Sequence, residues 1–173
     1  MKKLIDLSHT VEDGLITYKG LPAPIICDYL SREASKEIYS EGTTFQIGKI
    51  EMCSNTGTYL DSPFHRYENG KDLSELTLDS VASLDAIKIV VPQTVTAINK
   101  EYFKKTHVSG KAVLIQTNWS RPWNTEQYYE GHPYLTEDAA EFLKDNGALL
   151  VGIDTYNIDD VSGKDRPVHS VLL

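Results

Sequence analysis

The segment from Ser54 to Arg66 concentrates the side chains of this chain that could do chemistry. Asp61 offers a carboxylate, and His65 adds an imidazole four residues later. A carboxylate and an imidazole that converge on one pocket can carry out general acid/base catalysis or bind a metal ion. The same residue types also cap helices and stabilise turns, so this spacing alone leaves a structural role open.

Local chain geometry would bring further polar groups to this pair. If residues 58–61 are extended, the side chains of Tyr59 and Asp61 project from the same face, because side chains alternate along a strand. Gly57 permits a turn that brings Asn55 toward that face. The segment therefore predicts a polar pocket that follows a long strand.

The elements that position this segment are a mixture of strands and helices. The stretch 43–53 predicts a strand with a bulge near Gly48, where the parity of its apolar side chains switches. The clearest helix begins after the N-cap Thr136 and stops at Gly147. The fold class is mixed α/β, with strands predominating in the first half. The remaining expected elements are strands at 86–91, 112–115 and 148–153, and short helices at 79–84, at 99–106 and from Pro167 onward.

The motif itself is more specific than any single pair of residues. Residues 55–65 read N-T-G-T-Y-L-D-S-P-F-H, which resembles the H-x-G-T-H-x-D-x-P-x-H motif of the kynurenine formamidase/cyclase family of metal-dependent hydrolases. The segment from Val151 to Thr155, followed by Asp159, is similar to the family's G-I-D-T…D segment. The resemblance extends over nearly the whole chain. It implies a single domain over 1–173, with a central mixed sheet or barrel-like β core, surrounding helices and a homodimer.

The resemblance also implies roles for the motif residues. His65 matches the family's general acid/base, with Asp61 orienting it. Asp61 and His169 match family ligands of a divalent metal, zinc or manganese. The two family histidines that complete the motif's ligand set are replaced by Asn55 and Tyr59, which we expect to donate hydrogen bonds to the substrate or an oxyanion. Two ordinary ligands are too few for a tight zinc site.

Other residues extend the candidate site. The resemblance places Tyr18 in a substrate-side loop, and His132 precedes Pro133 in a loop rich in tyrosine, so both are candidate substrate contacts. Aromatic residues between 119 and 129 would form either a packed loop or an apolar wall for a cyclic substrate. Asp154 ends a predicted buried strand, where a catalytic carboxylate and a turn-forming one are both open. The family comparison predicts that the natural chain continues past Leu173.

Composition narrows the class of protein. The chain has 173 residues, with 17 Lys+Arg against 25 Asp+Glu and a net charge of −8. This charge argues against nucleic acid and anionic membranes as partners. Two cysteines without C-x-x-C spacing exclude a disulfide scaffold. Acidic and polar residues soon after Ile5 interrupt any apolar leader, so we expect a cytoplasmic protein.

These patterns favour a hydrolase or cyclase that acts on a small amide, formamide or lactone. The resemblance implies arylformamidase chemistry, with N-formylkynurenine as the family's best-known substrate and tryptophan catabolism as its setting. The alternative is a non-catalytic protein that binds small molecules on the same scaffold, because the loss of two metal ligands is what a retired active site would show.

Overall fold

A computed structural model describes residues 4–173. The contacts within the chain divide it into two compact units, residues 1–60 and residues 61–173. The expectation of one domain over 1–173 stays a prediction. No helix within residues 4–173 combines the length and the apolar composition that a membrane crossing needs.

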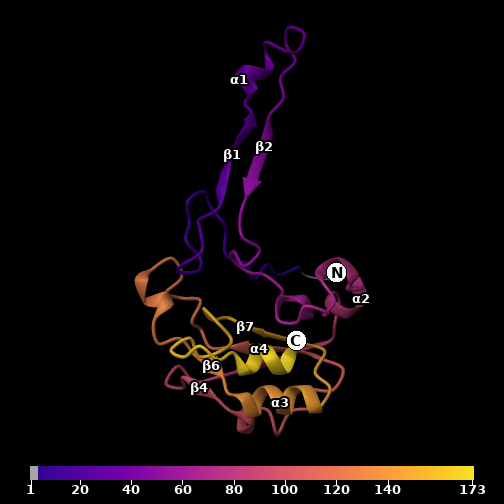
Figure 1. Cartoon of the computed structure of the whole chain (residues 1–173), viewed down its shortest axis with the longest axis vertical. Coiled ribbons are helices and arrows are strands. Elements are labelled where there is room, and N and C mark those ends of the chain that lie inside the picture. Colours follow the sequence, from indigo (N-terminus) through magenta and orange to yellow (C-terminus); the bar gives the residue numbers. More distant parts are fainter. Residues whose placement is uncertain (1–3) are drawn as a thin grey trace. The chain divides into compact units, whose positions relative to one another are not determined.

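The first unit contains a two-stranded antiparallel ribbon, β1 (Ile25–Leu30) and β2 (Ile47–Glu51), with the short helix α1 (Arg32–Ser35) between the strands (Figure 1). Asp28 pairs with Gly48 and Leu30 with Ile47, so Tyr29 is the extra residue. The bulge therefore lies in β1, opposite Gly48, and not in β2 as the sequence suggested. The strand expected at 43–53 is also shorter, because residues 43–46 pair with no strand.

The sheet of the second unit is parallel and has the order β3-β5-β7. Its strands are β3 (Ala86–Val90), β5 (Ala112–Gln116) and β7 (Leu150–Ile153), which confirms the three strands expected from apolar runs. Two short strands, β4 (Ala97–Ile98) and β6 (Tyr134–Leu135), form a separate parallel pair. Parallel strands need crossover connections, and the helix over residues 137–145 lies in the connection between β5 and β7.

Helices α3 (Glu137–Asp145) and α4 (Pro167–Leu172) pack against each other (Figure 1). Thr136 is the N-cap of α3 and Gly147 has a φ of 77° after its end, as expected. The helix expected at 79–84 is only α2 (Leu78–Val81), because Ser83 adopts a left-handed φ of 56°. The remaining helical turns are η1 (Pro63–His65), η2 (Leu73–Glu75), η3 (Lys100–Tyr102) and η4 (Glu126–Tyr129).

The helix expected at 99–106 is also wrong, since only the single 3-10 turn η3 forms there. Asn99 accepts from the backbone of Glu101, and Phe103 N bonds the carbonyl of Lys100 three residues earlier. Phe103 is fully buried, so packing of this one ring fixes a tight turn instead of a longer helix.

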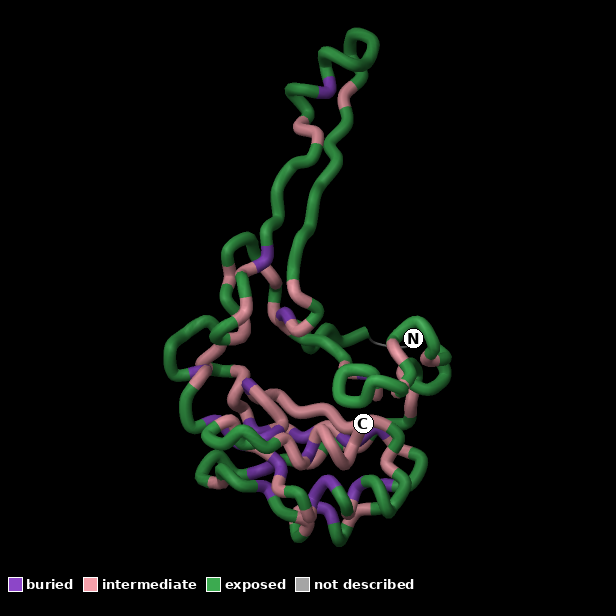
Figure 2. The backbone as a smooth tube through the Cα atoms, viewed as in Figure 1, coloured by how far each residue is buried: buried purple, intermediate pink, exposed green. Residues whose placement is uncertain are grey.

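The hydrophobic core belongs to the second unit, where the buried backbone in Figure 2 is concentrated. Its buried members come from the parallel strands, from α3 and α4, and from the loops between them. They are Val91, Ile98, Phe103, Val108, Val113, Ile115, Leu135, Ala139, Ala140, Leu143 and Val168. The strands of the ribbon in the first unit are exposed along almost their whole length. The second unit therefore supplies a rigid scaffold for side chains at its surface.

Candidate active site

The turn η1 carries His65, four residues after Asp61. Ser62 precedes the turn, Pro63 supplies its first residue with a fixed φ, and His65 N bonds the carbonyl of Ser62 at 2.9 Å. Gly70 packs so tightly on this turn that an added Cβ would lie 2.5 Å from the carbonyl carbon of Pro63. The backbone that carries His65 is thus held by a second close segment of chain.

Asp159 fixes the other histidine of the site. Its carboxylate accepts from the backbone N–H of Val168 at 2.8 Å and of His169 at 3.1 Å, and it also bonds Nδ1 of the His169 ring. The side chain has 0% exposure. Burial opposes its ionisation, but these hydrogen bonds outweigh burial and hold the pKa of Asp159 below its usual range. The Asp159 carboxylate therefore stabilises the first turn of α4 and also orients the His169 ring.

Asp61, His65 and His169 form one cluster, in which one ligating atom from each residue lies within 4.8 Å of the others. Nδ1 of His65 is 3.6 Å from Oδ1 of Asp61, and Nε2 of His169 is 3.9 Å from Oδ2 of Asp61. The His65 side chain is 42% exposed, whereas that of His169 is 14% exposed. The structure thus brings together three residues that the sequence had singled out, with His65 open to solvent.

The donor set can do two kinds of chemistry. A carboxylate beside an exposed imidazole can move a proton to or from a bound molecule. A carboxylate and a histidine whose second ring nitrogen is held by a buried carboxylate match the usual arrangement around a protein-bound divalent metal. Because Asp159 occupies Nδ1 of His169, it leaves Nε2 directed to the Asp61 side.

Asp154 has a structural role, which decides between the two readings left open by the sequence. Its carboxylate accepts from Thr117 N at 2.6 Å, Thr117 Oγ1 at 2.7 Å and Asn118 N at 2.9 Å. These contacts join the ends of β5 and β7 and hold Asn118 at a φ of 63°. The hydrogen bonds of this carboxylate thus stabilise the loop after β5.

His132 lies in an aromatic cluster and is only 4% exposed. Its ring centroid is 5.4 Å from that of Tyr156 and 6.4 Å from that of Tyr134, and Nδ1 contacts the carbonyl of Pro133 at 3.0 Å. Burial lowers the pKa of His132. Trp119 closes the same region, with Nε1 donating to the carbonyl of Tyr128 at 2.9 Å. The aromatic residues between 119 and 129 thus form a packed loop, the first of the two alternatives that the sequence left open.

The other expected substrate contacts, Asn55, Tyr59 and Tyr18, belong to the first unit. Oδ1 of Asn55 accepts from Ser54 Oγ at 3.1 Å, and Tyr59 is 42% exposed. Gly57 has a φ of 70°, the turn that the sequence predicted. The roles of these residues stay predictions.

Sequence reasoning gave Asp159 no role, and it missed Arg66, Tyr67 and Ser170, whose side chains join η1 to α4. Asp159 accepts from the N–H of Val168, nine residues later, and no local pattern in the sequence between them reveals this hydrogen bond. A faint signal was available for Asp159, because it is the last residue of the G-I-D-T…D resemblance.

The fold and the site define a class of protein, in which a parallel α/β unit presents a carboxylate–imidazole cluster at its surface. The Cyclase family model matches residues 5–160. The chain therefore belongs to the Cyclase family, which confirms the resemblance seen in the motif.

Several relatives are known. The chain is 29% identical over 171 residues to a kynurenine formamidase of Bacillus anthracis, covering 98% of this chain and 77% of that protein. It is 29% identical over 169 residues to a kynurenine formamidase of Bacillus cereus, covering 97% and 76%. A solved structure described as a potential metal-dependent hydrolase with cyclase activity has a TM-score of 0.76 at 22% identity, covering 98% and 76%. An isatin hydrolase bound to thioisatinate has a TM-score of 0.71 at 18% identity, covering 96% and 74%.

Proposed function

We propose that this protein hydrolyses a small amide, formamide or lactone. The observation that carries the proposal is the cluster of Asp61, His65 and His169, supported by membership of a family whose relatives include kynurenine formamidases. Opening such a carbonyl compound needs an activated water and a proton for the leaving group. The exposed imidazole of His65 beside the Asp61 carboxylate can serve both needs.

In this proposal His65 removes a proton from the attacking water and returns it to the leaving nitrogen or oxygen. Asp61 lies 3.6 Å from Nδ1 of His65 and stabilises the imidazolium that forms when the proton is held. The side chains of Asn55 and Tyr59 would donate hydrogen bonds to the developing oxyanion, with Tyr18 and His132 contacting the rest of the substrate. His132 is only 4% exposed, which limits how much of its ring a substrate can contact.

Asp61 and His169 are the residues that would hold a divalent cation, zinc or manganese. The fit is supported by the bond from Asp159 to Nδ1 of His169, which leaves Nε2 available as a ligand. When bound, such an ion would polarise the carbonyl of the substrate. Two protein ligands predict weak binding, and Asn55→His with Tyr59→His should tighten zinc binding by adding imidazoles at the family's spacing.

The test is turnover of N-formylkynurenine and of isatin, with and without added zinc or manganese. His65→Ala should lower the rate by roughly 10²–10⁴-fold, the usual effect of a lost acid/base. His107→Ala, at an exposed histidine outside the cluster, is the matched control and should keep full activity. The zinc affinity of His65→Ala distinguishes two roles for His65. If this affinity falls by as large a factor as the rate does, His65 is a metal ligand and not the acid/base.

A second candidate function is a non-catalytic protein that binds small molecules. The observation that favours it is the presence of Asn55 and Tyr59 where the family motif has histidines. Thermal-shift screening distinguishes the two functions. A binding protein would be stabilised by formamides or lactams that it leaves intact, whereas an enzyme would convert at least one of them.

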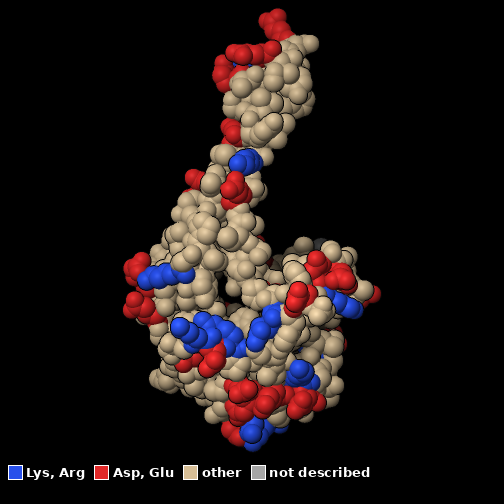
Figure 3. Space-filling model, viewed as in Figure 1, with Lys and Arg blue, Asp and Glu red and all other residues tan. Residues whose placement is uncertain are grey.

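We also propose that two copies associate through the β1–β2 ribbon. Its strands carry large exposed apolar side chains, including Tyr29, Ile50 and Ile47 at 77%, 67% and 48% exposure, and in Figure 3 the ribbon shows uncharged surface with a few charged side chains between. A two-stranded ribbon is marginally stable alone, and apolar patches of this kind usually mark an interface. Light scattering should give twice the chain mass of 19.4 kDa for the unmodified protein. Ile50→Lys should reduce the measured mass to that of one chain. Lys88→Gln, which also changes the charge but lies outside the ribbon, should keep the doubled mass.

A further inference from the structure

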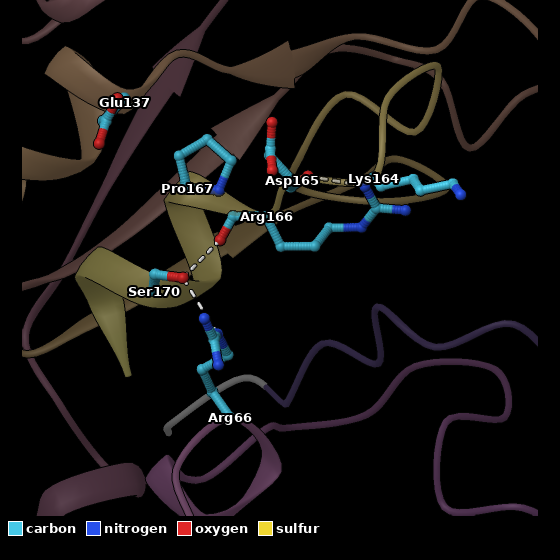
Figure 4. A pocket seen from close by; sticks show the side chains of 7 residues that line it. All are labelled: Arg66, Glu137, Lys164, Asp165, Arg166, Pro167 and Ser170. Atoms are coloured by element: carbon cyan, nitrogen blue, oxygen red, sulfur yellow. Dashed lines mark hydrogen bonds between the residues drawn. The ribbon is translucent and has the colours of Figure 1, made fainter.

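The turn that carries His65 and the helix that carries His169 are joined by the residues that directly follow the two histidines. Nε of Arg66 donates to Oγ of Ser170 at 3.0 Å (Figure 4). The hydroxyl of Tyr67 donates to the backbone carbonyl of Ser170 at 2.6 Å. We infer that Arg66, Tyr67 and Ser170 form a positioning clamp that sets the separation of the two imidazoles, an inference that rests on the proposed use of His65 and His169 in one site.

Ser170 is the centre of this clamp. Its hydroxyl accepts from Arg66 and donates to the carbonyl of Arg166 at 2.9 Å, so both hydrogen-bonding capacities of the group are used (Figure 4). The hydroxyl is therefore fixed against its own helix before Arg66 contacts it. A helix of six residues is marginal by itself, so its place depends on such side-chain anchors.

The other anchors of α4 do not reach the His65 turn. Asp159 binds the first turn of α4, and Nζ of Lys144 in α3 donates to the carbonyl of Val171 at 2.8 Å. These contacts tie α4 to the loop after β7 and to α3. Among residues 4–173, the hydrogen bonds that join α4 to η1 and the turn after it are those of the clamp. Removing them would leave α4 folded but free to shift relative to His65.

The turn on the other side is rigid enough to transmit the constraint. Tyr67 N bonds the carbonyl of Pro63 at 2.9 Å, and Gly70 N bonds the carbonyl of Tyr67 at 2.8 Å. Tyr67 thus belongs to the same hydrogen-bonded turn as His65. The guanidinium of Arg66 also lies 5.3 Å from the centre of the Tyr67 ring, which keeps the two donors of the clamp together.

Placement matters because the His65 ring meets both of its neighbours in the cluster at more than hydrogen-bond distance. Its Nδ1 approaches Asp61 at 3.6 Å, beyond hydrogen-bond distance, and its ring centre is 5.8 Å from that of His169. The position of the backbone therefore limits which places the ring can reach. A displacement of about 1 Å in a catalytic group can lower a rate by roughly 10²-fold.

The clamp is tested by a contact measurement and by kinetics. In protein labelled at histidine, NMR should show a nuclear Overhauser effect between the ring protons of His65 and His169. The double variant Arg66→Gln/Tyr67→Phe should lose this signal and lower kcat by roughly 10–100-fold with little change in KM, because ground-state binding is not the property removed. Ser170→Ala should weaken both, and Ser170→Thr, which keeps a hydroxyl, should restore them.

Lys144→Gln is the matched control, because it also removes one hydrogen bond to α4 but leaves the clamp intact. It should keep both the ring-to-ring signal and kcat. The proposal is overturned if the unmodified protein lacks the signal, or if the double variant keeps it at full strength. If the signal behaves as expected but the protein turns over no substrate, the clamp stands and the hydrolase assignment fails instead.

Discussion

Asp159→Asn removes the charge from a fully buried side chain while keeping its size. The asparagine retains one oxygen, which can still accept from Val168 N. Its amide nitrogen would then face two donors, the backbone N–H and the ring Nδ1–H of His169, where the carboxylate accepted both. The variant therefore tests whether the carboxylate holds the start of α4 and the His169 ring.

The expected loss of stability follows from these contacts. Hydrogen bonds to a charged group are worth about 1.5–3 kcal/mol each, so losing two would cost about 3–6 kcal/mol. A neutral amide costs less to bury than a carboxylate, which offsets part of the loss. The net destabilisation should be roughly 2–4 kcal/mol. Metal affinity should fall by roughly 10–100-fold, the usual effect of removing the partner of a ligating histidine.

Urea unfolding followed by circular dichroism measures the first effect and zinc titration the second. With a slope of about 2 kcal/mol per molar urea, the middle of the usual range, the unfolding midpoint should fall by roughly 1–2 M. Asp160→Asn is the control, because Asp160 is adjacent but exposed and bonds only locally to Ser162. A midpoint for Asp159→Asn that moves no further than that of Asp160→Asn would refute the anchoring role of Asp159.

Three further predictions concern residues around the site. Burial lowers the pKa of His132 in the folded protein, so below about pH 6.5 the unfolded chain binds a proton at this histidine before the folded protein does. The contribution of neutral His132 to stability is therefore complete above about pH 6.5 and is lost as the pH falls below that value. Urea midpoints should fall less steeply between pH 7.5 and pH 5 in His132→Gln than in the unmodified protein. Gly70→Ala should cost about 1–3 kcal/mol in urea unfolding because its Cβ would overlap Pro63, whereas Gly163→Ala, which meets nothing within 4 Å, should be neutral. Asp154→Ala should lower the thermal midpoint by removing the acceptor for the loop after β5, without the selective loss of zinc affinity expected for Asp159→Asn.

The three strands of the β3-β5-β7 sheet and α3 could be predicted because each is specified by a local signal. The runs 112–115 and 148–153 are continuously apolar, and α3 has an N-cap and a glycine stop. By contrast, β1 (Ile25–Leu30) was not anticipated, since five of its six residues are exposed and no alternation marks it. Its pairing with β2 is set by contacts across the ribbon, which a local pattern does not contain.

The candidate site divides in the same way. Asp61 and His65 lie four residues apart, so motif and spacing identified them together. His169 was reached through the family resemblance, and its approach to Asp61 depends on the packing of α4. The partners that hold these residues, Asp159 and Ser170, act over separations of 10 and 104 residues through individual hydrogen bonds. Such contacts leave no periodic trace in the sequence, so only the structure could show them.

The division of the motif between the two units bears on what chemistry this chain retains. Both positions where the family histidines are replaced, Asn55 and Tyr59, precede residue 61, whereas Asp61 and His65 follow the boundary. The second unit thus assembles Asp61, His65 and His169 from its own elements, including the buried carboxylate that orients His169. A general acid/base group and its carboxylate need no contribution from the replaced positions, but a full set of metal ligands does. The residues therefore support the proposal that His65 transfers protons and that any metal site here is weaker than one with the two motif histidines.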